Sequence, residues 1–339
     1  MNDGIVCAAG TGTAAKGGES HVHEAIAAQE YPGIRTRGVA VHAPRWTIGA
    51  SAAGGDQGHG VMKDCAVIAT HHKTGTVWMG SIFRDISVAC KLRLIRMQRL
   101  KGIAPEALVL PSIVINQHSD FKKCRWMLKH PRCRILHLIR DPRDIVLSAM
   151  RHHRTAKEDW LHKPRKAFDG LTYQQKINGL PDDRARCIFE MDNGARRTIR
   201  SMRKWNYARP GVIECRYESL IGDVGMTAFT AVLLHLGFED HELDACRTAI
   251  RENSLFGTVK EKKQAHIHSG AARQWAQAFD RSLAAEFIER FGDVLIELGY
   301  EKDNAWADAL PPAREARETD AQISVPGARI PVASAAAEA

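Results

Sequence analysis

The strongest constraint on the fold is an alternation, through the middle of the chain, between short apolar runs and longer amphipathic stretches. Short runs rich in Val and Ile, which are typical of buried strands, occupy residues 64–70, 112–117, 133–140 and 211–220. Helical spacing of apolar residues is found in residues 76–87, 141–153 and 226–237, and in a long terminal helix at 283–300. Short strands that alternate with helices predict βαβ units, and therefore an α/β fold with a central parallel sheet flanked by helices.

Composition divides the chain into three parts. Residues 1–60 are rich in Gly and Ala and lack periodicity, which predicts an irregular or disordered leader. Residues 61–304 hold the alternating pattern and are predicted to form the α/β domain, whereas residues 305–339 are rich in Pro and Ala and predict a flexible tail. Residues 155–183 fit neither period, so we interpret them as an insert that shapes a substrate pocket.

Charge and cysteine usage limit the partners and the environment. Lys+Arg 48 against Asp+Glu 39 gives a formal net charge of +9, which favours anionic ligands such as nucleotides and sulfated or phosphorylated compounds. The eight cysteines are scattered and form no C-x-x-C pair, as is typical of a reduced cytosolic protein. Because no apolar run is long enough for a membrane span and no secretory signal is visible, we predict a cytoplasmic protein.

The sequence THHKTGTVWM, at residues 70–79, lies where the first predicted strand ends and a helix begins. Open parallel sheets bind ligands at the carboxyl ends of their strands, and the N–H groups and dipole of a helix start attract anions. Lys73 adds a positive charge, and Gly75 permits close approach of the backbone. Two hydroxyl donors, Thr74 and Thr76, complete the loop. The full Walker pattern is absent because the lysine precedes the glycine, so an ordinary capped helix start is the alternative interpretation.

A second strand-to-helix junction follows at residues 133–153. Arg140 ends the strand, and Ser148 lies two turns further on. The planar guanidinium fork suits a phosphate, and a nearby hydroxyl completes such a site. The alternative is that Arg140 pairs with Asp141 or Asp144 and that Ser148 packs as a small helix residue.

The two junctions together resemble the sulfotransferase family, whose members use 3′-phosphoadenosine 5′-phosphosulfate (PAPS) as the sulfuryl donor. The family's first motif, K-x-G-T-x-W, holds the 5′-phosphosulfate, and its second motif, Arg-x₇-Ser, holds the 3′-phosphate. The resemblance implies a P-loop-like three-layer fold. It also implies that PAPS is bound by Lys73, Thr74, Gly75, Thr76, Val77, Trp78, Arg140 and Ser148.

Further segments resemble the family, so that the resemblance covers roughly residues 62–300. The segment WNYARPGVIECRYESLIGD is similar to the family's W…Y…R-Y-E-D-L segment, with Tyr217 at the position of an adenine-contacting tyrosine. In ENSLFGTVK, Leu255 stands where the family's S-F-x-x-[ML] segment has phenylalanine. The resemblance therefore implies an adenine contact for both residues, weaker at Leu255.

The family's nucleotide-covering loop, R-K-G-x-x-G-D-W-x-x-x-F, is altered in this chain, which has HSGAARQWAQAF at residues 268–279. His268 and Ser269 replace the Arg-Lys pair, which weakens the expected clamp on the 3′-phosphate. Arg273 replaces the second glycine and is a candidate for the missing charge. The matching residues are Gly270, Trp275 and Phe279.

The resemblance implies in-line transfer of the sulfuryl group to a hydroxyl or amine acceptor, with no metal required. Lys73 then stabilises the charge that develops on the leaving phosphate. His118 follows the second predicted strand and resembles the histidine of the family's K-T-H-x-P motif, which takes the acceptor's proton. The alternatives are that His118 is a surface residue, or that His71 or His72 is the base.

Other functions stay open from the sequence alone. A P-loop nucleotide kinase would need a Walker lysine and a magnesium-binding aspartate, and a family member without activity is a further alternative. A basic nucleic-acid-binding protein is suggested by KLRLIRMQRLK at residues 91–101, which we instead interpret as the solvated face of a helix. We expect a small-molecule or glycan acceptor and no nucleic-acid partner; the oligomeric state is not readable.

Overall fold

The computed structural model describes residues 34–35, 65–100, 104–205, 211–254 and 271–313. The chain divides into two compact units. Unit 1 combines the described residues up to Arg140 with residues 205–254. Unit 2 combines residues 141–204 with residues 271–313.

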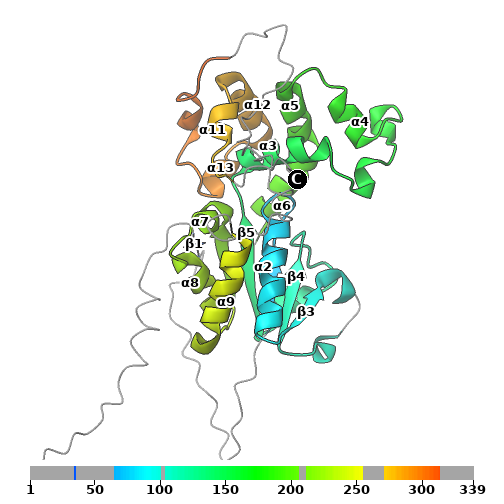
Figure 1. Cartoon of the computed structure of the whole chain (residues 1–339). Coiled ribbons are helices and arrows are strands. Elements are labelled where there is room, and N and C mark those ends of the chain that lie inside the picture. The colour runs from blue at the N-terminus through cyan, green and yellow to red at the C-terminus, as the bar shows by residue number, and fades with distance from the viewer. Residues whose placement is uncertain (1–33, 36–64, 101–103, 206–210, 255–270, 314–339) are drawn as a thin grey trace, which may run out of the picture. The chain divides into compact units, whose positions relative to one another are not determined.

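Unit 1 contains a six-stranded sheet (Figure 1). Its strands are β1 Ile34–Arg35, β2 Cys65–Ala69, β3 Arg93–Arg96, β4 Ser112–Asn116, β5 Cys133–Ile139 and β6 Val212–Arg216. Their order is β1-β6-β5-β2-β4-β3, in which β1 pairs antiparallel with β6 and all other pairs are parallel. This arrangement confirms the predicted α/β fold with a central parallel sheet.

The strand order reverses beside β2. From β2 the chain goes to β3 and β4 on one side, and it then crosses to β5 and β6 on the other side. In register, Ala69 at the end of β2 is paired with Asn116 of β4 and with His137 of β5. Open α/β sheets bind ligands at such a switch point, outside the carboxyl ends of the strands. The loops after β2, β4 and β5 are therefore placed to form one site.

Different elements of unit 1 cover the two faces of the sheet (Figure 1). Because side chains alternate along a strand, Ala66 and Ile68 of β2 face one layer, whereas Val67 and Ala69 face the other. The helices of the first layer are α2 Thr76–Ala89, α8 Thr227–His235 and α9 Asp240–Asn253. The second layer includes the short segments η1 Met97–Leu100 and η3 Arg125–Leu128. Burial on both faces explains why the central strands are continuous apolar runs.

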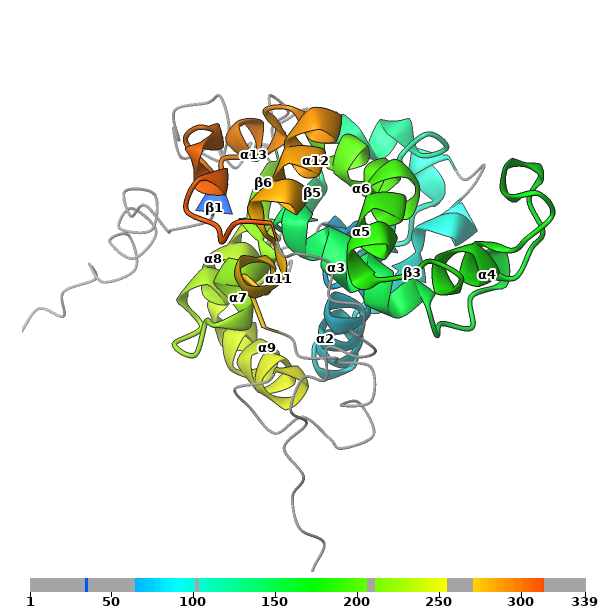
Figure 2. The ribbon, with the colours of Figure 1, turned by 90° about the horizontal axis from the view of Figure 1, so that it is seen from above.

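Unit 2 is helical in the ranges that the structure describes. Its α-helices are α3 Pro142–His153, α4 Tyr173–Asn178, α5 Asp183–Asp192, α6 Gly194–Arg203, α11 Trp275–Ala278, α12 Arg281–Phe291 and α13 Val294–Glu297. Its 3₁₀ segments are η4 Asp159–Leu161, η5 Lys166–Phe168 and η6 Asn304–Ala307. Helix α5 packs beside α3, α6 and α12 (Figure 2).

A buried arginine joins the beginning of α3 to the later part of unit 2. The side chain of Arg143 forms salt bridges of 2.7 Å with Asp141 and 2.6 Å with Glu301. Its guanidinium group lies 3.4 Å from the ring centroid of Trp275 and 4.6 Å from that of Trp306. Two carboxylates and two indole faces thus compensate the burial of this charge.

The predicted single helix at residues 283–300 is wrong, because the structure has two helices there. Helix α12 ends at Gly292, whose φ of 54° and ψ of −129° are incompatible with a continuing helix, and α13 follows. Beyond α13, η6 places the side chain of Trp306 in the interior of unit 2. Packed structure therefore continues past the boundary predicted at residue 304.

The interpretation of residues 91–101 as a helix face is also wrong. Arg93–Arg96 form the edge strand β3, in which both arginines are exposed and the two residues between them are half-buried. Lysine and arginine side chains are well suited to an edge strand, because they discourage pairing with another chain.

The strand predicted at residues 211–220 ends at Arg216, because α7 Tyr217–Ile221 begins directly after it. The remaining short segment is η2 Pro105–Ala107. In the described ranges, no helix has the combination of length and hydropathy that crossing a bilayer would take.

Candidate functional site

The loop after β2 is closed by its own polar groups. Its backbone is left-handed at Lys73, with φ 67°, and at Gly75, with φ 100°. The N–H of His71 donates to Oγ1 of Thr74 at 2.8 Å, and the carbonyl of His71 accepts from the N–H of Thr74 at 3.2 Å. The hydroxyls of Thr74 and Thr76 donate to the same carbonyl at 2.9 and 2.8 Å. His71 is thus the centre of the loop's hydrogen bonds.

The two predicted hydroxyl donors therefore hold the shape of the loop. Because the hydroxyl of Thr76 donates to the carbonyl of His71, the hydroxyl of Thr70 is the donor in its 2.9 Å contact with Thr76. The side chain of Thr74 is fully buried. Ligand contacts of Thr74 and Thr76 stay predictions.

The beginning of α2 has the polarity of an anion-binding site. Gly75 is its N-cap and supplies no side-chain cap, and the first turn of the helix contains no acidic residue. The N–H groups of this turn, together with the helix dipole, present partial positive charge. Lys73 lies two residues before the cap, and Val77 in the first turn is 71% exposed. An anion can reach this helix end from solvent beside Val77.

The second predicted motif reaches the first in unit 1. Arg140 follows β5, and its Nη1 donates to the carbonyl of Lys73 at 3.2 Å. The guanidinium group of Arg140 lies 4.5 Å from the ring centroid of Tyr217. That ring packs edge-on against Trp78, with 5.6 Å between centroids, and a Cβ on Gly75 would lie 3.0 Å from its Cδ2. Five residues predicted to bind one nucleotide are therefore neighbours.

Trp78 is held in place by the end of α9. Its Nε1 donates to the carbonyl of Asn253 at 2.9 Å, and its ring packs edge-on against Phe229. The side chain of Asn253 donates to Asp85 on α2 at 2.7 Å, so the two helices are bound together beside the tryptophan. The predicted contacts of Leu255, His268, Ser269 and Gly270 lie outside the described residues.

The predicted base, His118, is exposed on the loop after β4. Its N–H donates to Oδ1 of Asn116 at 3.4 Å, and the neighbouring Ser119 donates its hydroxyl to the carbonyl of Thr70 at 2.9 Å. The loop that carries the predicted base is thereby bound to the loop that carries Lys73. An exposed imidazole at this position is accessible to an acceptor from solvent.

A pair of buried histidines lies beneath the β2 loop. Nε2 of His71 and Nε2 of His137 are 2.7 Å apart, and the imidazole of His137 stacks on Trp205 at 3.9 Å between centroids. Burial, reinforced by the charge of His118, lowers the pKa of His71 to about 3, so His71 is neutral at neutral pH. Sequence reasoning missed His137, although a polar residue inside the apolar run CRILHLIR is a visible signal.

The two aspartates that follow Arg140 accept hydrogen bonds from backbone N–H groups of unit 2. Asp141 caps α3 through the N–H of Arg143, and Asp144 accepts from the N–H groups of Arg273 and Trp275, at 2.9 Å each. Trp275 is buried, which makes it a core residue of unit 2, whereas Arg273 is exposed. The role of Arg273 as a replacement charge stays a prediction.

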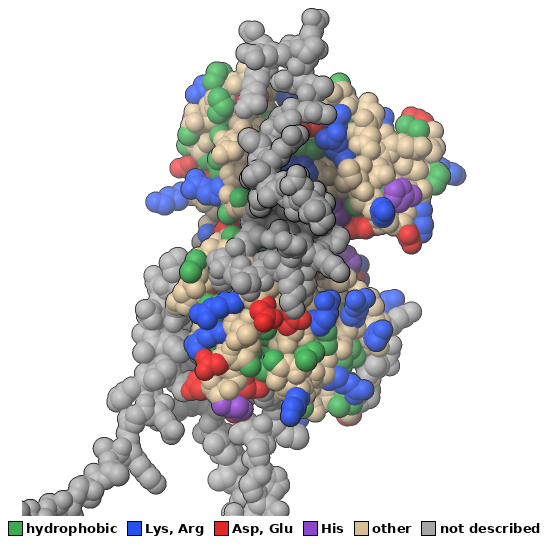
Figure 3. Space-filling view, in the orientation of Figure 1, with side chains coloured by type: hydrophobic (Ala, Val, Ile, Leu, Met, Phe, Trp, Pro, Cys, Tyr) green, Lys and Arg blue, Asp and Glu red, His purple; other side chains and the backbone are tan. Residues whose placement is uncertain are grey.

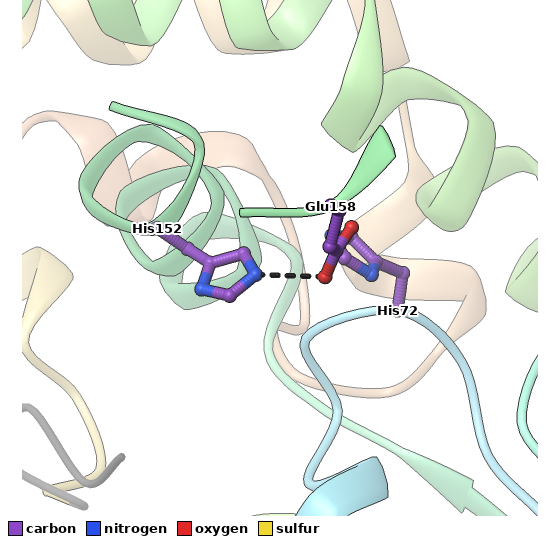
Figure 4. Close-up of side chains that lie close together, drawn as sticks. All are labelled: His72, His152 and Glu158. Atoms are coloured by element: carbon purple, nitrogen blue, oxygen red, sulfur yellow. Dashed lines mark hydrogen bonds and ion pairs between the residues drawn. The ribbon is translucent and has the colours of Figure 1, made fainter. Parts of the chain in front are cut away.

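Ser148 and the predicted insert also belong to unit 2. Ser148 lies in the second turn of α3 and is half-buried, and its contact with the 3′-phosphate stays a prediction. The insert begins after α3, where Nε2 of His152 lies 3.0 Å from Oε1 of Glu158 (Figure 4). Glu158 also accepts from the indole of Trp160 at 2.6 Å. The insert is therefore anchored within unit 2, and its effect on an acceptor pocket stays a prediction.

Charged side chains of both signs share the surface of unit 1. On the face drawn in Figure 3, acidic side chains lie between groups of Lys and Arg side chains. The basic side chains on this face therefore do not form an unbroken stripe of the kind that nucleic-acid-binding surfaces show.

Comparison with known proteins finds a family model that matches part of this chain. Residues 63–213 match the family model described as "Sulfotransferase domain". Over these residues the match confirms the predicted resemblance to the sulfotransferase family. No curated protein matches the chain.

Solved structures that match this chain include mouse sulfotransferase SULT7A1 complexed with PAP, at 15% identity and a TM-score of 0.45, over 68% of this chain and 84% of that one. Retinol dehydratase in complex with androsterone and inactive cofactor PAP has 15% identity and a TM-score of 0.42, over 68% and 80%. Retinol dehydratase in a complex with retinol and PAP has 15% identity and a TM-score of 0.41, over 70% and 82%. Similarity this low adds nothing about a substrate.

Proposed function

We propose that this chain, whose residues 63–213 match the sulfotransferase domain, moves the sulfuryl group of PAPS in line to a hydroxyl or amine of a small-molecule or glycan acceptor. In this proposal Lys73 stabilises charge on the donor, and His118 accepts the acceptor's proton. Tyr217 contacts the adenine, Arg140 binds the 3′-phosphate, and Trp78 belongs to the loop that holds the 5′-phosphosulfate.

One observation carries the proposal: the two predicted motifs are in direct contact. Nη1 of Arg140 donates to the carbonyl of Lys73, so the loop for the 5′ end and the arginine for the 3′-phosphate are adjacent. They lie at the switch point of the sheet, where a parallel α/β fold binds its ligand. A doubly phosphorylated nucleotide needs positive charge at two separate groups, and these two loops supply it.

The residues of the site fit the donor. The N-cap of α2 is a glycine without a side-chain cap, and its first turn holds no carboxylate that would repel a phosphate. PAPS, when bound, supplies a sulfuryl group on a phosphate leaving group. In this proposal Lys73 and the N–H groups at the beginning of α2 stabilise the negative charge that grows on that phosphate.

His118 is suited to the acceptor side of the reaction. It is exposed, and the hydrogen bond from Ser119 to Thr70 binds its loop to the donor loop. An imidazole that accepts the proton of an attacking hydroxyl makes that hydroxyl a better nucleophile. The buried His71 is a poorer candidate, because its pKa of about 3 makes it a weak base.

A donor-turnover assay tests the proposal. Labelled PAPS is offered with a panel of phenols, alcohols, amines and glycans in the presence of a metal chelator, and labelled ATP with added magnesium replaces PAPS in a parallel series. We expect label transfer from PAPS alone; transfer of phosphate from ATP would identify a kinase instead.

The same assay tests the role of the loop lysine. We expect Lys73→Ala to lower kcat by about a hundredfold, as for loss of a group that stabilises the transition state. Lys91→Ala is the matched control, because Lys91 is an exposed lysine of unit 1 with the same left-handed backbone, at the far end of α2. Equal kcat values for the two variants would contradict the role of Lys73.

A further inference from the structure

The histidine pair beneath the β2 loop joins two strand ends that both contribute to the site. His71 is the second residue after β2, and His137 lies within β5, paired in register with Ala69. Their Nε2 atoms are 2.7 Å apart, a hydrogen-bond distance, and the two side chains are buried. For this bond one imidazole donates through Nε2–H and the other accepts through Nε2.

The aromatic surroundings exclude water from this pair. Trp205 stacks on His137 with 4° between the ring planes, and it meets His71 edge-on at 6.5 Å. Phe121 packs edge-on against Trp205, at 5.6 Å between centroids. In such an environment, breaking the hydrogen bond between the two histidines leaves buried nitrogens unsatisfied, which costs free energy. The pair therefore resists separation.

The backbone of His71 holds the shape of the loop that carries Lys73. Its N–H and carbonyl together bind Thr74 and Thr76, so a movement of His71 moves both threonines. The left-handed backbone at Lys73 costs conformational free energy, and the loop keeps this shape only if its ends are held.

We propose that His71 and His137 are positioning residues, whose mutual hydrogen bond anchors residues 71–76 to β5 and so sets the placement of Lys73 and of the first N–H groups of α2. The identity of the ligand placed there, the 5′ end of PAPS, rests on the proposed function. The low pKa of His71 agrees with this role, because an anchor that stays neutral holds its hydrogen bond across the pH range of the reaction.

Two substitutions of His137 separate anchoring from mere filling of space. His137→Phe keeps the ring and removes the nitrogen, whereas His137→Gln places an amide near the position of Nε2. His235→Gln is the matched control, because His235 also bonds through Nε2, to the carbonyl of Gly211 before β6, at the other end of the strands. Binding of 3′-phosphoadenosine 5′-phosphate (PAP) is measured by calorimetry. Amide hydrogen exchange is measured on the same full-length proteins.

We expect His137→Phe to raise the Kd for PAP about tenfold, as for a lost buried hydrogen bond, and His137→Gln and His235→Gln to stay within about threefold of the unmodified protein. In His137→Phe the amide of Thr74 should exchange about tenfold faster, while that of Val67 in β2 is unchanged. Unchanged binding and unchanged exchange of Thr74 in His137→Phe would overturn the proposal. Equal acceleration of Thr74 and Val67 would do the same, since it reveals only a general loss of stability.

Failure of the proposed function would be seen separately. If the unmodified protein does not bind PAP, the assignment of PAPS as the ligand of this loop is wrong. The exchange rates still decide whether the histidine pair anchors the loop, because they need no ligand.

Discussion

Gly75 is the position where conformation and space both forbid a side chain. Its φ of 100° lies in the left-handed region, where an L-residue is strained by roughly 1–2 kcal/mol. An added Cβ would lie 3.0 Å from Cδ2 and 3.3 Å from Cε2 of Tyr217, and 3.5 Å from Leu138. The tyrosine ring cannot retreat freely, because it is buried between Arg140 and Trp78.

The expected cost of Gly75→Ala follows from these contacts. Overpacking in a buried contact adds on the order of 1–3 kcal/mol to the destabilisation caused by backbone strain. Alanine also lowers the entropy of the unfolded chain, which stabilises the folded protein by about 0.5–1 kcal/mol. These contributions, with the backbone strain, sum to a range of about 1–4.5 kcal/mol, and we expect a net loss near its centre, about 2–3 kcal/mol in the free energy of unfolding. At about 2–4 °C per kcal/mol, that corresponds to a Tm lower by about 4–12 °C. The Kd for PAP should rise at least about tenfold, because either the loop or Tyr217 must move.

Gly80→Ala provides the matched control in the same helix. Nothing lies within 4 Å of a Cβ at Gly80, which is in the interior of α2, so alanine should stabilise the protein by about 0.5–1 kcal/mol. The measurements are thermal unfolding followed by circular dichroism, and calorimetric titration with PAP. The reasoning is refuted if Gly75→Ala melts with the unmodified protein and binds PAP equally well.

Three further predictions concern single side chains. His118→Ala should abolish sulfuryl transfer and leave PAP binding intact, because the residue acts on the acceptor; a parallel loss of PAP binding in calorimetry would instead indicate a structural role. Arg140→Ala should weaken binding of PAP much more than binding of adenosine 5′-phosphate, and equal losses for the two nucleotides would contradict its assignment to the 3′-phosphate. Because the pKa of His71 is lowered from 6.5 to about 3, the unfolded chain binds a proton that the folded chain does not, and stability is lost as the pH falls from about 6.5 towards 3. The slope is up to about 1.4 kcal/mol per pH unit. Denaturant unfolding from pH 6 to pH 4 should therefore show a flatter dependence for His71→Phe, and an unchanged slope would count against the assignment.

Local patterns were sufficient where one physical rule dominates. The strands β2, β4 and β5 are buried on both faces, so their apolar runs were unmistakable in the sequence. Edge strand β3 was mistaken for a helix face, because its exposed arginines mask a short alternating pattern. The division into two units was likewise invisible, since unit 2 is assembled from segments that lie far apart in the chain.

The sequence by itself determined the chemistry of the donor loop: a lysine, a glycine and two threonines between a buried strand and a helix. Spacing along the chain was enough to predict that these four residues act together, because they are consecutive residues of one turn. Only the tertiary structure decided that the threonine hydroxyls hold the loop, that Arg140 reaches the carbonyl of Lys73, and that His71 meets His137. The last two contacts join the loop after β2 to β5 and its end; the two strands are adjacent in the sheet although some 60 residues separate them. Strand order, which no local pattern encodes, brings them together.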